Sequence, residues 1–547
     1  MRTKILSFLL LGALVGVTSS CEDFLDIQNY TEKNTSNYPE TLTDAEQIIT
    51  AIYNNLNIVC ATPAPSYLMY AELASDDRLG GGGANDQLMQ AIDMLLFYTG
   101  QTHQQFWKDR YIGVQRANNA LQTLPICQGY ESEAQMNQML GEAHFLRAFY
   151  YYELASMFEN IPLQLTPIAE ELPQATPDET WGQIIYDLKQ AIELMPAEKT
   201  PAARAGHVDK YVAEAMMARA FLFYTGFYNK TEVVLPNEAG TVTKANVISW
   251  IDDCVNNSGY TLVGDFRNLW AYTNRLTVDD YEYTKDVIGV DGKPLAWVEN
   301  DQAANPESMF AIKFSMFASW GTTIGFSNGF ALFFGPREFN QNVGQSFPFG
   351  AGWGAGPVAP NLWNDWIAAE PKDLRRQASI ADVNAEMTGE DHTWKFGFGS
   401  GSVGNSWIQE TQYYAKKTGP VQSKRAPGDY AATFEVDMYG YANDMQLANI
   451  HDLMLIRFAD ALLMQSELKE DVTGINRVRA RAGLEPIAAY SLQALQNERR
   501  WELAFEGVRW NDMRRWGIAA EALAKQENVV VANNAVVGMN TRHGAGY

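Results

Sequence analysis

The sequence has few of the residues that build metal, disulfide or nucleic-acid sites. Its 547 residues include 4 Cys and 6 His, and no two Cys stand at metal-ligand spacing. Lys and Arg number 41 against 65 Asp and Glu, for a formal charge of -24. Binding a phosphate backbone requires clustered Lys and Arg, so we expect no nucleic-acid partner. We also predict no metal site and no cofactor, with calcium left open.

Beyond its first residues the sequence lacks an apolar run of the roughly 20 residues that a membrane-spanning helix needs. At the N-terminus, Arg2 and Lys4 precede a mostly apolar run at 5–17, and small polar residues follow. This order is typical of an export signal, so we predict a signal peptide at residues 1–20. Its removal would leave 39 basic and 65 acidic residues.

The four cysteines have two predicted roles. Cys21 directly follows small residues, as in a bacterial lipoprotein cleavage site, where the thiol is acylated. Thr18 stands where such sites usually carry Leu, so cleavage by the ordinary signal peptidase is the alternative. Several acyl chains, at about 0.8 kcal/mol per buried methylene, hold a protein on a membrane. For Cys60, Cys127 and Cys254, one disulfide with a free thiol and three buried thiols are both open.

Helical patterns dominate residues 43–260. Three predicted capping boxes mark helix starts: Thr43-x-x-Glu46, Ser132-x-x-Gln135 and Thr176-Pro177-x-Glu179. A further helix is predicted over about 209–224, where repeated alanines allow neighbouring helices to approach closely. Paired helices of this length are typical of a tetratricopeptide-like array, although no strict period or repeat consensus is present.

Residues 497–517 alternate full charges with large apolar side chains, which predicts a buried helix weakened at Gly507. The apolar face would comprise Trp501, Ala504, Phe505 and Val508. The charges must be paired, because an unpaired buried charge costs several kcal/mol. Three-residue spacing predicts these pairs: Arg509 with Glu506 and Asp512, and Arg515 with Asp512. A solvated amphipathic helix is the alternative.

This stretch also has an unusual order of residues. Glu-Arg-Arg-x-Glu-Leu-Ala-Phe-Glu-Gly-x-Arg at 498–509, followed by Arg-Arg-Trp-Gly at 514–517, resembles the C-terminal signature of the SusD/RagB family. Members of that family are surface glycan-binding lipoproteins that partner TonB-dependent transporters. Further similar segments lie at residues 21–26, 71–77, 141–148, 453–463 and 475–484. The resemblance runs from Cys21 to Gly517 and is weakest in the middle third.

The resemblance implies a mostly α-helical, SusD-like fold. Tetratricopeptide-like helical hairpins would form a scaffold, and a loop-rich, aromatic-rich region would face the ligand. We expect an N-terminal helical part at 21–296, and a loop-rich region with the C-terminal SusD/RagB helices at 297–547, as one integrated unit.

Aromatic residues concentrate at 297–407, which holds 7 of the 14 Trp and 12 of the 26 Phe. Helical patterns are rare there. We interpret the region as a loop-rich surface on which Gly-rich backbone presents aromatic side chains. An irregular core packed over the helices is the alternative.

The best candidate ligand site is the loop at 78–86, which combines Arg78, Asn85 and Asp86 with four consecutive glycines. Sugar hydroxyl groups form hydrogen bonds with such side chains, and pyranose rings rest on flat aromatic rings. We therefore pair the loop with some of four tryptophans: Trp320, Trp353, Trp394 and Trp407. A plain surface loop and ordinary buried tryptophans are the alternative.

Three patterns typical of enzymes lack their usual context. The G-x-S-x-G at 325–329 would need a strand before it and a helix after it, and we predict neither. The G-x-G-x-x-G at 399–404 lacks the strand and helix of a dinucleotide site, so a loop is favoured. Asp76 and Asp77 could be half of a paired-carboxylate site, but adjacent acids on a helix point apart, and this segment resembles a structural landmark of the family. We predict no catalytic residue.

The resemblance thus implies a lipoprotein on the outer face of a Gram-negative outer membrane that is not an enzyme. It would capture a glycan or oligosaccharide and deliver it to a TonB-dependent, SusC-like transporter. Two alternatives are open: an envelope enzyme that hydrolyses glycans or peptides, and a SusD-like protein that binds peptides.

Overall fold

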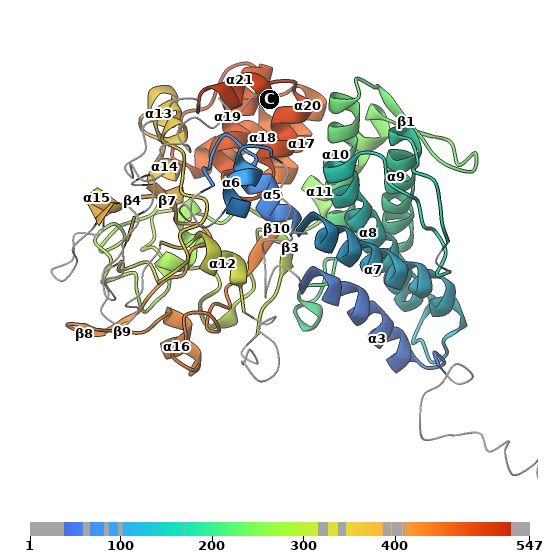
Figure 1. Ribbon diagram of the computed structural model, residues 1–547, viewed down its shortest axis with the longest axis horizontal. Coiled ribbons are helices and arrows are strands. Elements are labelled where there is room, and N and C mark those ends of the chain that lie inside the picture. Colours follow the sequence, from blue (N-terminus) through green and yellow to red (C-terminus); the bar gives the residue numbers. More distant parts are fainter. Residues whose placement is uncertain are drawn as a thin grey trace, which may run out of the picture.

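The computed structural model describes residues 38–57, 66–80, 87–96, 102–168, 170–315, 327–336, 346–386, 395–396, 407–408, 411 and 413–526. Long helices fill one side of the molecule and its top, and loops with short helices and strands fill the other side (Figure 1). The prediction of a mostly α-helical fold is confirmed.

The helical half is built from six helices, with the short helices α5 (Tyr67–Leu73) and α6 (Gln87–Asp93) standing in the chain between the first and the second of them. They are α3 (Leu42–Tyr53), α7 (Thr102–Thr123), α8 (Glu133–Phe158), α9 (Pro177–Leu194), α10 (Lys210–Phe227) and α11 (Lys244–Asn257). From α7 onward, each helix packs against the next (Figure 1). Their lengths differ, so the tetratricopeptide-like repeat stays a prediction.

The remaining helices are short or belong to the C-terminal group. They are α5 (Tyr67–Leu73), α6 (Gln87–Asp93), α12 (Gly329–Phe334), α13 (Pro360–Ala369), α14 (Leu374–Ser379), α15 (Val383–Glu386), α16 (Phe434–Tyr439), α17 (Phe458–Lys469), α18 (Thr473–Arg481), α19 (Leu492–Leu503), α20 (Arg509–Arg515) and α21 (Ala519–Ala524). Single 3-10 turns occupy Asn54–Asn57, Leu124–Ile126, Ala202–Arg204, Phe266–Leu269, Ala271–Thr273 and Asn300–Gln302.

All described strands form two-stranded sheets. The antiparallel pairs are β1 (Glu232–Val234) with β2 (Thr241–Thr243), β3 (Ser308–Ile312) with β10 (Leu453–Arg457), β4 (Ile380–Asp382) with β7 (Tyr413–Ala415), and β8 (Lys424–Ala426) with β9 (Asp429–Tyr430). The parallel pair is β5 (Lys395–Phe396) with β6 (Trp407–Ile408). The β3–β10 pair lies at the centre of the molecule, between the two sides (Figure 1).

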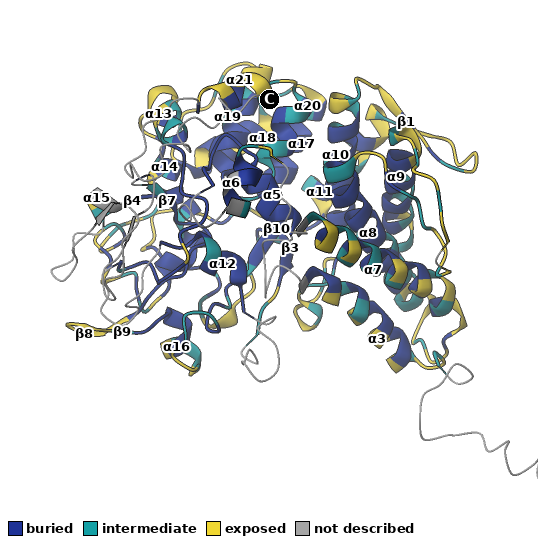
Figure 2. Ribbon diagram, in the orientation of Figure 1, coloured by how far each residue is buried: buried dark blue, intermediate teal, exposed yellow. Residues whose placement is uncertain are grey.

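The largest hydrophobic core joins α7 to α11 with α17 and the β3–β10 pair. Buried faces of these helices point inward and exposed residues face outward (Figure 2). Ala213, Ala215, Ala218 and Ala220 of α10 are fully buried, as the alanine pattern predicts. Small side chains allow α10 to pack closely against both α9 and α11.

Helix starts follow the predicted caps at Ser132 and Thr176, and the helix predicted over about 209–224 has a cap of its own. The Ser132 hydroxyl accepts a hydrogen bond from the amide of Gln135 at 3.2 Å. Thr176 and Glu179 form a reciprocal capping box at the start of α9. Asp209 caps α10 and accepts from the amide of Val212 at 3.0 Å. Each cap satisfies a backbone donor that the first helical turn leaves without a partner.

The predicted start at Thr43 is wrong by two residues. The N-cap is Thr41, and its capping box is closed by Asp44, whose carboxylate accepts from the Thr41 amide at 3.0 Å. The overlapping patterns Thr41-x-x-Asp44 and Thr43-x-x-Glu46 compete in the sequence. Burial decides between them, because Asp44 is buried whereas Glu46 is exposed.

The predicted continuous helix over 497–517 is also wrong, although its burial is confirmed. Helix α19 ends at Leu503 and α20 begins at Arg509. Between them, Phe505 and Gly507 have φ of 67° and 73°, which no helix accommodates. The amide of Gly507 donates to the Glu72 carboxylate at 2.7 Å, so a contact with α5 stabilises the non-helical backbone between α19 and α20.

The charges of this segment are paired, but not always with the predicted partners. Arg515 contacts Asp512 at 2.8 Å, as predicted. Arg509 instead contacts Asp76 at 2.7 Å, because the break turns it away from Glu506. The general expectation that these charges are paired is confirmed, although partners such as Asp76 lie outside the segment.

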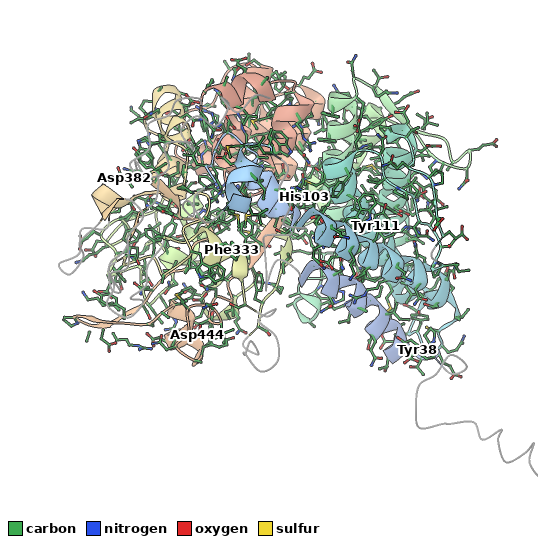
Figure 3. The ribbon with its side chains drawn as sticks, in the orientation of Figure 1. Tyr38, His103, Tyr111, Phe333, Asp382 and Asp444 are labelled. Atoms are coloured by element: carbon green, nitrogen blue, oxygen red, sulfur yellow. The ribbon has the colours of Figure 1, made fainter. Side chains whose placement is uncertain are left out.

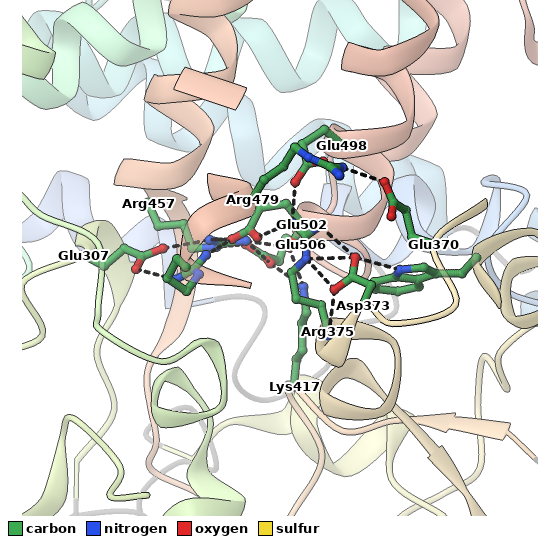
Figure 4. A network of polar contacts seen from close by, with 12 residues as sticks. Glu307, Glu370, Asp373, Arg375, Lys417, Arg457, Arg479, Glu498, Glu502 and Glu506 are labelled. Carbon is green, nitrogen blue, oxygen red and sulfur yellow. Dashed lines mark hydrogen bonds and ion pairs between the residues drawn. The ribbon is translucent and has the colours of Figure 1, made fainter. Parts of the chain in front are cut away.

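A cluster of buried charges joins the C-terminal helices to the loop-rich side (Figure 4). Its centre is the Glu502 carboxylate, which forms ion pairs with Arg375, Arg457 and Arg481. We call this group the Glu502 cluster. Glu502 has no exposed surface. Burial alone would raise its pKa, but the three guanidinium groups hold the pKa well below its ordinary value.

Cys127 and Cys254 are buried free thiols, so no disulfide joins them. Cys21 and Cys60 lie outside the described residues. Among the described helices, none is long and apolar enough to cross a membrane. The described part of the chain also contains no group of three or more His, Cys, Asp and Glu side chains that could hold a metal ion.

Candidate ligand-binding site

Arg78, the first predicted ligand contact, lies in the interior. Its Nε donates to Glu72, and its Nη1 donates to the carbonyl of Gly356 at 2.7 Å. The guanidinium lies 4.1 Å from the ring centre of Phe334 and 4.6 Å from that of Phe505. Burial lowers the pKa of Arg78, and the Glu72 charge opposes that shift. With no exposed surface, Arg78 cannot contact a ligand, so this prediction is wrong.

The interior position of Arg78 fixes the start of the predicted loop. Residues 78–80 run beside residues 356–358, where the amide of Leu79 donates to the carbonyl of Pro357 at 2.9 Å. The amide of Gly356 donates to the carbonyl of Gly80 at 3.1 Å. The loop that follows Gly80 therefore begins next to the segment that carries Trp353.

Trp353 is 39% exposed and packs on Phe333, a half-buried residue of α12. The ring centres lie 4.7 Å apart, with the planes inclined by 48°. The Trp353 amide donates to the carbonyl of Leu332, and the Ala355 amide to that of Phe333, each at 2.9 Å. Phe333 lies near the middle of the view in Figure 3. We call these two residues the aromatic pair.

Glycine allows this segment to lie against α12. A Cβ atom at Gly352 would stand 2.5 Å from the Cα of Gly335. Gly356 has φ of 57°, and a Cβ atom there would stand 2.4 Å from the Phe334 ring. No larger residue fits either position without moving the chain. The glycines of the aromatic-rich region thus support an exposed tryptophan, as the surface interpretation predicts.

Other tryptophans of the region belong to an irregular core, which was the alternative to an aromatic surface. Trp297 and Trp366 are buried, the latter stacked on Trp501 at 5.0 Å. Trp363 is half-buried and stacks on Tyr413, with ring centres 4.8 Å apart. The region is therefore partly core and partly surface.

Several predicted site residues cannot be placed. Asn85, Asp86, Trp320 and Trp394 lie outside the described residues. Trp407 lies in β6, whose backbone alone is described. Among the predicted contacts whose side chains are described, Trp353 is at the surface and Arg78 is not. Its partner Phe333 was missed, because Phe333 and Phe334 are adjacent in the sequence and only packing distinguishes the exposed one.

Asp76 and Asp77 are buried and held by arginines, as their predicted structural role requires. Arg500 contacts both carboxylates, at 3.0 Å and 2.8 Å, and Arg509 also contacts Asp76. Burial would raise the pKa of Asp76, but Arg500 and Arg509 lower it below its ordinary value. Burial raises the pKa of Asp77, and the charge of Asp76 adds to that rise.

The G-x-S-x-G pattern does not form a nucleophile site in the described residues. A short helix, α12, does follow it, contrary to our expectation. Ser327 is buried, however, and its hydroxyl donates to the carbonyl of Asn449 at 3.2 Å. His451 is paired with Glu435 at 3.0 Å and makes no hydrogen bond to Ser327. The G-x-G-x-x-G at 399–404 lies outside the described residues.

Comparison with known families decides the chain's affiliation. Residues 23–224 match a family described as "Starch-binding associating with outer membrane", and residues 367–538 match the family described as "SusD family". Together the two matches cover more than half of the chain. The chain belongs to the SusD family.

Relatives of this SusD family protein match most of its length. SusD-like protein P38 of Formosa agariphila is 22% identical over 544 residues, which cover 95% of this chain and 92% of the relative. A solved structure named "Laminarin binding SusD-like protein" is 25% identical, with a TM-score of 0.67, over 89% of this chain and 94% of its own. Surface glycan-binding protein A from Bacteroides thetaiotaomicron, solved with laminarihexaose, is 18% identical, with a TM-score of 0.66, over 88% and 92%.

In this SusD family protein, the described candidate site is therefore the aromatic pair and the backbone beside it. Two segments far apart in the sequence, 78–80 and 352–358, converge there on α12. The site can offer a flat apolar face to a ligand.

Proposed function

We propose that this protein is a cell-surface lipoprotein that binds a glycan or oligosaccharide and delivers it to a TonB-dependent, SusC-like transporter. The observation that carries the proposal is the exposed indole of Trp353, held on Phe333 beside the start of the glycine-rich loop. The relatives named for laminarin and laminarihexaose support a glycan as the ligand class.

An exposed tryptophan matches what a sugar needs. One face of a pyranose ring carries C–H groups, and this face packs on an aromatic ring, while the hydroxyl groups bond to polar side chains. A tryptophan held by neighbouring backbone loses little conformational entropy on binding. The loop after Gly80 would supply the polar contacts, through Asn85 and Asp86.

Binding without bond cleavage fits the described chemistry. A glycosidase needs two carboxyl groups that flank the scissile bond. Asp76 and Asp77 are committed to Arg500 and Arg509 in the interior. We therefore propose binding and delivery, with no catalytic residue assigned.

Attachment through lipidated Cys21 would place the binding surface at the outer face of the outer membrane. Tethering beside a transporter raises the effective concentration of captured ligand, so modest affinity is sufficient. On this proposal the protein covers the transporter mouth, and closed and open arrangements differ in their affinity for ligand. Mass spectrometry of the mature N-terminus tests the lipid, and a free Cys21 thiol would contradict it.

Trp353→Ala tests the ligand surface directly. We expect it to cost about 2 kcal/mol of binding free energy, roughly a 30-fold loss of affinity, because central aromatic contacts dominate binding. Native gels that contain laminarin, starch or other polysaccharides would show weaker retardation of the variant than of wild type, with an unchanged circular dichroism spectrum. Phe227→Ala is the matched control, since Phe227 is also 39% exposed but lies on α10.

Two results would contradict the proposal. Equal retardation of wild type and Trp353→Ala would remove the aromatic pair from the site, and no retardation of wild type by any glycan would remove glycans as the ligand. Incubation with the same polysaccharides tests the hydrolase alternative, because new reducing ends would appear only with an enzyme.

A further inference from the structure

A pocket lies away from the aromatic pair. It has a volume of about 440 Å³ and is lined by residues of α13, α19, α20 and α21. These helices lie together at the top of the molecule in Figure 1, whereas Phe333 of the aromatic pair lies near its middle in Figure 3. The volume falls within the range of about 300–1,000 Å³ typical of small-ligand sites. We call it the α19 pocket.

Helix α19 presents three side-chain amides to this pocket: Gln493, Gln496 and Asn497. Gln493 donates to Asn497 at 2.9 Å. Gln496 is only 8% exposed, yet its amide makes no hydrogen bond to any described residue. Neither amide atom of Gln496 is among the fully buried polar atoms without a partner, so the amide is open to the pocket. It can therefore donate a hydrogen bond to a ligand there and accept one from it.

The cations of the α19 pocket are already paired. Arg500 contacts Asp365 at 3.0 Å in addition to Asp76 and Asp77. Arg509 contacts Asp76, and Lys525 lies 4.0 Å from Asp365. These three cations therefore face three acids.

The pocket has no spare positive charge for an anionic ligand, because Glu521 adds a further acid to its lining. A sulfated or uronic sugar would be repelled there. The remaining lining is apolar and consists of Ala368, Ala369, Trp501, Ile518 and Ala522. Side-chain amides next to apolar surface match a neutral, hydroxyl-rich molecule.

We propose that the α19 pocket is a second binding site for neutral sugar units of the glycan, separate from the aromatic pair. This inference rests on the proposed glycan-binding function. The mature protein would hold one glycan chain at two places, which raises avidity when the chain spans both. Gln496 provides hydrogen bonds to hydroxyl groups, and Ala369 and Ala522 contact the apolar ring face.

Isothermal titration calorimetry with neutral hexasaccharides tests the proposal. The probes are laminarihexaose, maltohexaose and cellohexaose, with tetragalacturonate as the acidic comparison. Ala369→Trp fills the pocket from α13, where Ala369 is exposed, and leaves every ion pair in place. Ala520→Trp is the matched control, because Ala520 is an exposed alanine of α21 outside the pocket lining. Gln496→Leu removes the amide at nearly constant volume.

We expect wild type and Ala520→Trp to bind two molecules of one neutral probe per chain. Trp353→Ala and Ala369→Trp should each bind one, and the double variant none. Gln496→Leu should weaken the second event by about tenfold or more.

Each other outcome identifies what has failed. A single site that Trp353→Ala abolishes and Ala369→Trp leaves unchanged overturns the α19 pocket and leaves the proposed function intact. A wild-type protein that binds none of the probes overturns the proposed function itself. Binding of tetragalacturonate in preference to the neutral probes, lost in Ala369→Trp, overturns the ligand class assigned to the pocket.

Discussion

Glu214 of α10 is a buried acid whose surroundings favour its neutral form. It has no exposed surface, and neither carboxylate oxygen accepts a hydrogen bond from a described residue. Burial raises its pKa to about 9; Lys210, 3.4 Å away, opposes the rise, and Asp253 adds to it. The ordinary pKa of a glutamate is 4.5. Between pH 4.5 and about 9, the folded protein therefore keeps a proton on Glu214 that the unfolded chain releases.

This difference predicts how stability varies with pH. The contribution of protonated Glu214 to the free energy of unfolding is fully present below pH 4.5 and is lost as the pH rises through 9. Glu214→Gln cannot titrate, so its melting temperature relative to wild type should rise between pH 5 and pH 9. Thermal unfolding at pH 5, 7 and 9 measures the difference. Glu46→Gln, at an exposed site on α3, is the control, and parallel pH profiles for all three proteins would refute the assignment.

For single residues, the sequence indicates which side chains can bind or pair, but it does not predict their burial or their partners. Arg78 looks like a surface donor, yet it bonds to Glu72 and to the carbonyl of Gly356, which lies 278 residues away. Arg509 has acids at the right helical spacing, yet it pairs with Asp76, 433 residues away. Local spacing cannot predict partners that only the fold brings near. Trp353 is exposed because glycines hold its segment against α12, which composition did suggest.

At the scale of elements, α17 and α18 cross closely at Gly474. A Cβ atom there would stand 2.0 Å from the carbonyl oxygen of Leu462, which is backbone and cannot rotate away. The amide of Gly474 also donates to the Ser466 hydroxyl at 2.9 Å. The two helices can therefore pack at this distance only with glycine at position 474.

Gly474→Ala should destabilise the protein by about 1–3 kcal/mol, the usual cost of an overpacked core. Urea denaturation followed by tryptophan fluorescence measures the free energy of unfolding. Thr473→Ala, one residue away and exposed, should change that free energy by less than about 0.5 kcal/mol. A Gly474→Ala variant as stable as Thr473→Ala would show that α17 and α18 can move apart freely.

Helix starts were predictable where a single cap was available, as at Ser132 and Thr176. The break after α19 was not. Phe505 has φ of 67°, a conformation that local preference opposes. It is imposed by contacts from elsewhere, since Arg78 lies over the Phe505 ring and Glu72 accepts from Gly507. Helical periodicity continues across the break because the segment stays buried on both sides of it.

At the scale of the whole molecule, the family signature predicted the fold class, but the way the chain closes on itself could not be predicted. Strand β3 pairs with β10, more than 100 residues later in the chain. Arg375 of α14 reaches Glu502 of α19 at 2.9 Å, which joins the loop-rich side to the C-terminal helices. Such contacts leave no local pattern in the sequence. The division of the chain at residues 296 and 297 stays a prediction.

The Glu502 cluster gives the last prediction, because one carboxylate there neutralises guanidinium groups from α14, β10 and α18. Glu502→Gln should lower the free energy of unfolding at pH 7 by about 3 kcal/mol or more, since it leaves buried charge uncompensated. The pKa of Glu502 is held below its ordinary 4.5, so its contribution is present above pH 4.5 and is lost on acidification. The difference in free energy of unfolding between wild type and the variant should therefore shrink as the pH falls toward 3, as urea unfolding at pH 7, 5 and 3 would show.

Glu470→Gln, which alters an exposed ion pair with Lys244, should match wild type at every pH. If both variants behave alike, the cluster does not hold the two sides together.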